Sequence, residues 1–444
     1  MTHRYLPTDR KNVVEWLMGL SIVIGLGALI RTFYITGYLP APFVFDVSDT
    51  FMDWYNVAYY AHNVGPYSVY HSVYAPLSFV VTGIFGEPSC YGYHAKDARD
   101  CDVIGIIHIL AIYVLCVVVT AISFFKQDKS SALTRTIAIA VGGPMLFALE
   151  RGNLIMHTYI AFVLLFGSIF LSRAMLAAAA AFLINFKFYM MLPVMSFGIK
   201  RDWRKLELCG IAAIALYLIT LAIVNAGTPV DLAENLKIWF NLRAGTIWDE
   251  VLYSTTYKPY LLFDVRLYPV RDFVLQETID IATISIKIIV YSSRAIAFVC
   301  IFAGWLYPKV VSVQRLAFFI LMQSFIDQNP GGYAMTFITF LIFTEKWTNA
   351  RVGLAIVIAY LVNFPADYTI VELFRYERLS WLSQRMVDSA YGLSLGSIIR
   401  PGLLVVMLWA IAIDTLLAVY RQMRIGRPLL GLSAPVPARE VANI

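Results

Sequence analysis

Long apolar runs recur from one end of this 444-residue chain to the other, and they limit the folds it can adopt. The first run covers residues 13–35. A helix needs roughly 20 apolar residues to cross a bilayer core of about 30 Å. Charged residues make up only 14% of the chain, against about 25% in a typical soluble domain. We therefore predict an all-α polytopic membrane protein, because a β-barrel would need short alternating segments.

The formal net charge of +6 reflects how Lys and Arg are distributed between the runs. They form short clusters at 4–11, 126–135, 200–205, 309–315, 346–351 and 421–427. Such clusters mark the cytoplasmic ends of membrane helices, so we expect both termini in the cytoplasm and no nucleic-acid partner. The first run is too long for a signal-peptide core and lacks a small-residue cleavage site, which predicts a retained span.

Eight apolar runs are read as single spans, and two longer segments are read as hairpins. The single spans are 13–36, 103–125, 206–226, 281–306, 310–326, 332–346, 351–364 and 401–420. Segment 137–171 is broken by a polar cluster at 150–153, and segment 174–199 carries Lys187 at its middle. Each is too long for one span and short for two, so we predict hairpins of short helices with outward-pointing polar tips. The total is about twelve membrane segments.

Three long polar or aromatic stretches then lie on the outer face, and they divide the chain into two modules. Residues 1–226 form one module with a first outer loop at 37–102. Residues 227–444 form a second module with outer loops at 227–280 and 365–400. Within these loops, 54–61, 233–248 and 373–386 have helical spacing, which predicts interfacial helices that roof a cavity. The alternative is that the Trp and Tyr residues of these loops simply lie at the membrane–water interface, as they commonly do in membrane proteins.

The first outer loop carries three carboxylates, Asp46, Asp49 and Asp53. Asp49 and Asp53 are four residues apart, so a helix would place both on one face. A carboxylate in a partly apolar cavity should have a raised pKa, which suits a general base. The alternative is that Asp49 only caps the helix that follows.

The two predicted hairpin tips carry polar groups that suit an anionic or hydroxylated ligand. The first has Glu150, Arg151 and Asn153, with His157 one helical turn beyond. Arg151 and Asn153 would donate to a sugar or a phosphate, unless Arg151 pairs internally with Glu150. Lys187 would be costly facing lipid, so we expect it to face an anion such as phosphate, or to pair with Glu150.

Weaker candidates and the cysteines complete the inventory. Lys258 and Arg266 lie in the second outer stretch, and Asn329 and Tyr333 close a later span, where surface-loop chemistry is the alternative. Cys90 and Cys101 flank a polar loop, and if this loop lies outside the membrane, an oxidising compartment would permit a disulfide between them. The alternative is that both cysteines stay free. No zinc spacing, Walker motif or dinucleotide fingerprint is present, so we predict neither a metal nor a cofactor.

Taken in order, these residues resemble a known family. The order is Asp49 and Asp53, Gly65-Pro66-Tyr67, Tyr74-Ala75-Pro76-Leu77, Glu150-Arg151-Gly152-Asn153, and Phe186-Lys187 with Pro193 before Lys200-Arg201-Asp202-Trp203-Arg204. This pattern resembles the GT-C integral membrane glycosyltransferases, specifically the polyprenol-phosphate-mannose-dependent mannosyltransferase branch. The likeness covers the first half of the chain. Ala75 stands where the family has the first proline of a Pro-Pro pair, and Asn153 is all that matches the family's Gln-Val-Asn element.

The resemblance implies a GT-C-like helical bundle in a bacterial inner membrane, with an active site facing the periplasm. It implies a polyprenyl-phosphate-linked sugar donor and a lipid-linked or polymeric glycan acceptor, with Asp49 or Asp53 as the base of an inverting transfer. Arg151 and Lys187 would lie near the lipid phosphate. Asp46, Tyr74 and Tyr189 are further candidates for substrate binding. Three rivals remain, namely an oligosaccharide polymerase or ligase, a glycolipid transporter or flippase, and a non-catalytic scaffold. The sequence leaves the sugar, the acceptor and the oligomeric state open.

Overall fold

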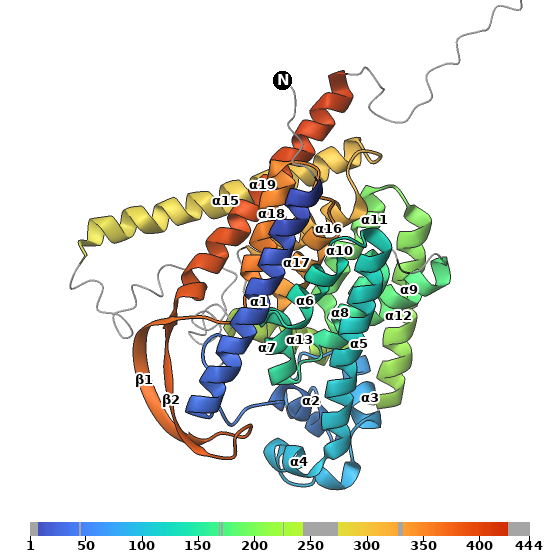
Figure 1. Cartoon of the computed structure of the whole chain (residues 1–444). Coiled ribbons are helices and arrows are strands. Elements are labelled where there is room, and N and C mark those ends of the chain that lie inside the picture. Colours follow the sequence, from blue (N-terminus) through green and yellow to red (C-terminus); the bar gives the residue numbers. More distant parts are fainter. Residues whose placement is uncertain are drawn as a thin grey trace, which may run out of the picture.

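The computed structural model describes residues 8–43, 46–167, 169, 172–224, 226–242, 274–326 and 332–424. They form a helical bundle with one two-stranded sheet (Figure 1). Six helical stretches in this part of the chain are long and apolar enough to cross a membrane. They are α1 (Thr8–Thr36), α5 (Val103–Gln127), α6 with α7 (Ala132–Ala140 and Gly143–Arg151), α12 (Trp203–Val224), α15 (Gln276–Leu306) and α19 (Leu395–Arg424).

Shorter apolar helices fill the space between the long ones. They are α8 (Ile155–Phe166), α9 (Arg173–Phe186), η2 with α10 and α11 (Phe188–Met190, Met191–Val194 and Ser196–Ile199), α16 (Val313–Phe325), η5 with α17 (Gly332–Ala334 and Met335–Phe343), and α18 (Ala350–Val362). The 14 residues of α9 span about 21 Å at a rise of about 1.5 Å per residue. That is less than a bilayer core of about 30 Å. The expectation of about twelve spans is therefore reduced to six long apolar helices in the described ranges.

Both predicted hairpins are present. Helix α7 ends at Arg151, Gly152 adopts the left-handed conformation, and α8 runs in the opposite direction. Just beyond α8, the Ile169 carbonyl accepts a hydrogen bond at 3.2 Å from Lys126 Nζ at the end of α5. Helix α9 ends before Lys187, and the chain returns to Lys200, whose Nζ donates to the Val311 carbonyl at 2.6 Å. The two tips thus lie at one end of the bundle, called here the acidic end. Lys126 and Lys200 mark the other, the basic end.

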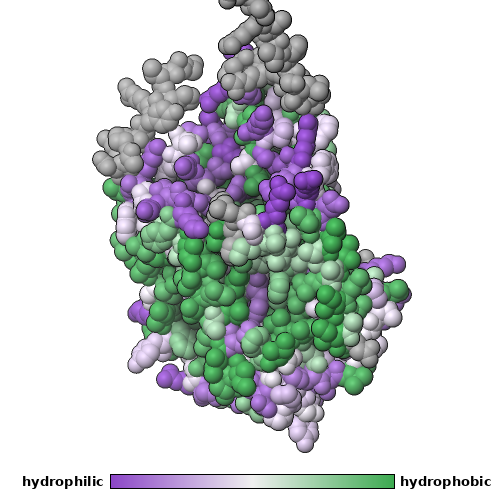
Figure 2. Space-filling view, turned by 90° about the vertical axis from the view of Figure 1, so that its right-hand side faces the viewer, coloured by the Kyte–Doolittle hydropathy of each residue, from purple (hydrophilic) through white to green (hydrophobic). Residues whose placement is uncertain are grey.

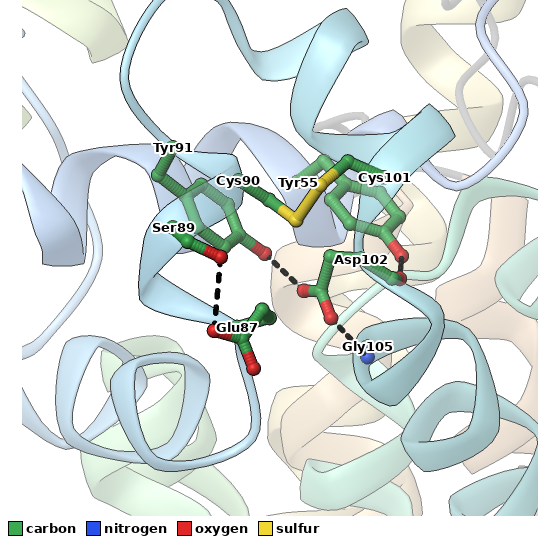
Figure 3. Close-up of a disulfide and its surroundings, with 8 residues drawn as sticks. All are labelled: Tyr55, Glu87, Ser89, Cys90, Tyr91, Cys101, Asp102 and Gly105. Atoms are coloured by element: carbon green, nitrogen blue, oxygen red, sulfur yellow. Dashed lines mark hydrogen bonds between the residues drawn. A yellow bond between two sulfur atoms is a disulfide. The ribbon is translucent and has the colours of Figure 1, made fainter.

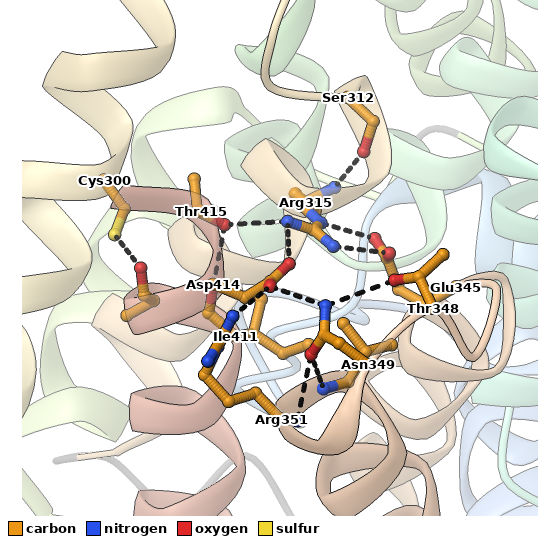
Figure 4. Close-up of polar contacts among 12 residues, drawn as sticks. Cys300, Ser312, Arg315, Glu345, Thr348, Asn349, Arg351, Ile411, Asp414 and Thr415 are labelled. Carbon is orange, nitrogen blue, oxygen red and sulfur yellow. Dashed lines mark hydrogen bonds and ion pairs between the residues drawn. The ribbon is translucent and has the colours of Figure 1, made fainter. Parts of the chain in front are cut away.

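Several charged side chains inside the basic end form ion pairs. Arg135 on α6 donates to both carboxylate oxygens of Glu15 on α1 at 2.8 Å. Arg315 on α16 pairs with Glu345 at 2.8 Å and with Asp414 on α19 at 3.0 Å, as Figure 4 shows. Removing one partner of such a buried pair leaves an uncompensated charge, so these pairs fix how the helices assemble.

Small elements cover the acidic end. They are α2 (Met52–His62), α3 (Pro76–Ile84), η1 (Pro88–Cys90), α4 (Ala95–Cys101) and α13 (Pro229–Leu242). Helix α2 confirms the helix predicted at 54–61. Helix α13 confirms the one predicted from 233 as far as Leu242, and 243–248 lie outside the described residues.

The helix predicted at 373–386 is wrong. This stretch belongs to an antiparallel hairpin of β1 (Thr369–Leu379) and β2 (Met386–Ser394), so the fold is not all-α. The β-branched residues at the start of β1, Thr369 to Val371, favour a strand, and Arg375 faces Ala390 across the pair. Strand pairing of this kind is not visible in a local helical pattern.

Apolar side chains form a belt across the middle of the face shown in Figure 2, with hydrophilic residues at both ends. Many Ile, Leu and Val side chains on α1, α5 and α12 are exposed. The protein therefore has the architecture of a multi-pass membrane protein.

Candidate functional site

Residues 46–51, called here the acidic loop, form a tight turn before α2. Helix α2 begins at Met52, and Phe51 precedes it with a left-handed φ of 64°. Asp49 therefore lies outside the helix, so neither the predicted helical pairing of Asp49 with Asp53 nor the alternative role of Asp49 as N-cap is observed. The Phe51 N–H donates to the Glu150 carbonyl at 2.7 Å, which ties this loop to the end of α7.

Arg151 brings the two carboxylates together. Its Nη1 lies 2.8 Å from Asp49 Oδ2, and its Nη2 lies 2.7 Å from Asp53 Oδ1. Asn153 Nδ2 donates to the second oxygen of Asp53 at 2.5 Å. The side chains of Arg151, Asp49 and Asp53 are between 12% and 20% exposed, so they are shielded from water but still reachable. Residues about one hundred positions apart thus form one cluster, and Arg151 pairs with aspartates rather than internally with Glu150.

The environment of Asp53 differs from the expectation. Burial by itself would raise the pKa of this carboxyl. The charge of Arg151, hydrogen bonds from Arg151 and Asn153, and the charge of Lys187 together outweigh burial and hold the pKa of Asp53 below its usual value. The prediction of a raised pKa is therefore wrong for Asp53, because the chain folds two cations against it.

Lys187 lies at the second hairpin tip, beside this cluster. Its Nζ lies 4.4 Å from the centre of the Tyr74 ring, and its charge acts on Asp53. The alternative pairing of Lys187 with Glu150 is not observed. Glu150 Oε1 instead accepts from Thr50 Oγ1 at 2.9 Å, and its Oε2 has no hydrogen-bond partner within the described ranges. Tyr189 follows in η2 and packs against Phe325.

Three other predicted site residues contact residues outside the cluster. Asp46 forms an ion pair with Arg378 on β1 and accepts from the Ser48 hydroxyl at 2.8 Å. His157 Nε2 lies 2.9 Å from His108 Nε2. The ring of Tyr333 stacks on Phe147 with ring centres 5.8 Å apart.

A shallow recess with room for about one water molecule lies next to the cluster. Its lining comes from the loop after α1, the acidic loop, the end of α7 and the tip of the β-hairpin: Tyr38, Leu39, Phe43, Asp46, Val47, Thr50, Glu150, Ser380 and Leu382. Its polar lining can accept hydrogen bonds from hydroxyl groups.

Three predicted site residues, Lys258, Arg266 and Asn329, lie outside the described residues. Among the residues that are described, no group of three or more His, Cys, Asp or Glu side chains could hold a metal ion.

Cys90 and Cys101 form the permitted disulfide, with Cα atoms 5.6 Å apart. Sequence reasoning missed Arg99, which lies inside this disulfide-closed loop. Its side chain is 5% exposed and donates to the Ser48 and Thr50 carbonyls. Trp381 was missed too, and its ring lies against the Arg99 guanidinium. An arginine in a short polar loop between two cysteines was the available signal for Arg99, whereas nothing in the sequence pointed to Trp381.

The cluster combines two carboxylates with an arginine, an amide and a lysine at one end of a membrane bundle. Carboxylates of this kind can accept a proton or a hydroxyl hydrogen bond, and the cations can bind a phosphate. Comparisons with family models, curated proteins and solved structures find no match for the chain. The proposal that follows therefore depends on the residues themselves.

Proposed function

We propose that the protein is a membrane glycosyltransferase of GT-C type. It takes a sugar from a polyprenyl-phosphate donor and passes it to a hydroxyl of a lipid-linked glycan or polysaccharide. The observation that carries the proposal is the meeting of Asp49, Asp53, Arg151 and Lys187 at the acidic end. A proton acceptor and phosphate-binding cations are the two groups that such a transfer needs.

The hydrogen bonds favour Asp49 as the general base. Both oxygens of Asp53 are engaged, one by Arg151 and one by Asn153. Asp49 gives only Oδ2 to Arg151, and its Oδ1 has no hydrogen-bond partner among the described side chains. Asp53, whose pKa is lowered, stays ionised and holds Arg151 and Asn153 in place.

The transfer is an in-line displacement. Asp49 takes the proton of the acceptor hydroxyl as that oxygen bonds to the anomeric carbon. The bond from this carbon to the donor phosphate oxygen breaks, and polyprenyl phosphate leaves with the bonding electrons, so the anomeric centre is inverted. Arg151 and Lys187 stabilise the negative charge on the leaving phosphate, and partial shielding from water strengthens those contacts.

The proposed location is the outer face of a bacterial inner membrane, with both termini in the cytoplasm. The clusters of Lys and Arg at the basic end support this orientation. The Cys90–Cys101 disulfide at the acidic end supports it independently, because disulfides persist in oxidising compartments.

The test is a transfer assay with the purified protein in lipid nanodiscs. Radiolabelled polyprenyl-phosphate sugars and an envelope lipid extract are supplied, and label in the acceptor fraction is measured. Asp49→Asn should reduce transfer about 10²- to 10⁴-fold, as expected for loss of a general base. The control is Asp388→Asn on β2, whose carboxylate is 57% exposed and pairs with Arg375, and it should transfer normally.

Two outcomes would contradict the proposal. One is the absence of transfer from every polyprenyl-phosphate sugar offered to the wild-type protein. The other is movement of intact glycolipid across the bilayer without bond cleavage, unaffected by Asp49→Asn, which would indicate a flippase.

A further inference from the structure

The disulfide-closed loop at 90–101 is fastened to the helix that carries Asp53. Asp102, immediately after the loop, is buried and caps α5 by accepting from the Gly105 N–H at 3.0 Å. Its other carboxylate oxygen accepts from the Tyr91 hydroxyl at 2.6 Å, and its backbone carbonyl accepts from the Tyr55 hydroxyl on α2 at 2.6 Å. Figure 3 shows this network beside the disulfide. Both ends of the loop are therefore held by buried groups.

From this position the loop grips the backbone on both sides of Asp49. Arg99 Nη1 donates to the Ser48 carbonyl at 2.6 Å and to the Thr50 carbonyl at 3.1 Å. Lys96 Nζ donates to the Ser48 hydroxyl at 3.0 Å. A buried guanidinium that donates to the carbonyls before and after one residue limits the movement of that residue's backbone.

The tip of the β-hairpin covers this grip. Trp381 places its ring 4.9 Å from the Arg99 guanidinium carbon, and its indole N–H donates to Asp100 at 2.8 Å. Its backbone N–H donates to the Val47 carbonyl at 3.1 Å. The ring shields the Arg99 hydrogen bonds from water, which strengthens them.

We propose that the disulfide-closed loop is the positioning device of the site, with Arg99 as the positioning residue for Asp49 and Trp381 as its cover. The role depends on the proposed function, because it assumes that Asp49 acts on the acceptor hydroxyl. Arg99 donates to the Ser48 and Thr50 carbonyls and pairs with Asp100 at 3.2 Å. Among the described contacts it touches no side chain of the cluster, so it acts through the backbone that carries Asp49. A displacement of about 1 Å at a reacting group can cost about 10²-fold in rate.

The first test needs no enzymatic activity. Hydrogen exchange by mass spectrometry is measured in nanodiscs for peptides that cover residues 46–53. Arg99→Gln and the double variant Cys90→Ser/Cys101→Ser should both exchange faster there, with exchange in α18 unchanged. The control is Arg375→Gln on β1, whose 55% exposed side chain pairs with Glu372 and Asp388, and it should behave as wild type. Unchanged exchange at 46–53 in both loop variants would overturn the proposal.

The second test measures transfer by the same variants. Arg99→Gln should lower kcat about 10- to 100-fold, with KM for the donor changed less than about twofold. Arg99→Lys, which keeps the charge and one donor direction, should recover part of kcat. Faster exchange with an unchanged kcat would overturn the positioning role. Faster exchange in a protein whose wild type transfers no sugar would refute the glycosyltransferase and still support the grip on residues 48–50.

Discussion

Arg151 is shared between two carboxylates, and this sharing gives each a different chemistry. Its two terminal nitrogens bind Asp49 and Asp53 separately, at 2.8 and 2.7 Å. Asn153 takes the remaining oxygen of Asp53 and leaves Asp49 with one oxygen available among the described contacts. Two neighbouring acids can thus divide into a structural anion and a proton acceptor, because their hydrogen-bond partners differ.

The lowered pKa of Asp53 makes the stability of the protein depend on pH. A carboxyl whose pKa is lower in the folded state stabilises the fold above its unfolded pKa of 3.8. That stability is lost as the pH falls through the folded value. We expect wild type to unfold at a higher temperature than Asp53→Asn at pH 6, with the difference shrinking below about pH 4. Unfolding midpoints in detergent between pH 3 and pH 6 measure this, and a constant difference would contradict it.

At the scale of elements, the turn between α7 and α8 places Arg151 and Asn153 against the acidic loop. Gly152 in this turn has a φ of +60°, and a Cβ there would lie 3.1 Å from the Cα of Phe51. Glycine adopts this conformation without strain, whereas Phe51, which faces it, has a left-handed φ that side-chain-bearing residues rarely adopt. The backbones of the turn and the loop therefore pack closely at this point. The hairpin tip and the acidic loop therefore depend on one another.

Gly152→Ala should lower the free energy of unfolding by about 1–3 kcal/mol, because alanine is strained at this φ and its Cβ meets the Phe51 backbone. The matched control is Gly27→Ala in α1, where a Cβ would meet nothing within 4 Å. Because Gly27 is exposed and lies within a helix, its replacement by alanine should raise the free energy of unfolding by up to about 1 kcal/mol. Thermal unfolding midpoints of both variants in detergent test this prediction. Equal midpoints for the two variants would contradict the close packing of Gly152 on Phe51.

The whole molecule has two polar ends separated by an apolar belt, and the ends differ in what they hold. The basic end carries ion pairs such as Arg315 with Glu345 and Asp414, which lock helices together (Figure 4). The acidic end carries Asp49, Asp53 and the disulfide. Charge within the bundle thus stabilises assembly at one end and forms the candidate site at the other.

The proposed orientation predicts opposite labelling of the two ends. Val64, in the turn after α2, is 92% exposed, and Ser130, between α5 and α6, is exposed at the basic end. In intact cells a membrane-impermeant maleimide should label Val64→Cys and leave Ser130→Cys unlabelled. The unmodified protein is the control, because Cys116, Cys209 and Cys300 are buried and the other two cysteines are paired. The reverse pattern would place the site in the cytoplasm and refute its proposed role.

The sequence alone is enough to predict the membrane class and the approximate positions of many helices, such as 103–125 for α5 (Val103–Gln127) and 351–364 for α18 (Ala350–Val362). It also located both hairpin tips and the disulfide cysteines. Apolar length and local breaks decide these features, and both are written in consecutive residues. Three features follow only from the folded chain: residues 369–394 form a β-hairpin, Arg151 links Asp49 with Asp53, and Arg99 donates to backbone carbonyls of the acidic loop. Those outcomes depend on pairing between segments far apart in the chain, and such pairing leaves no local pattern to read.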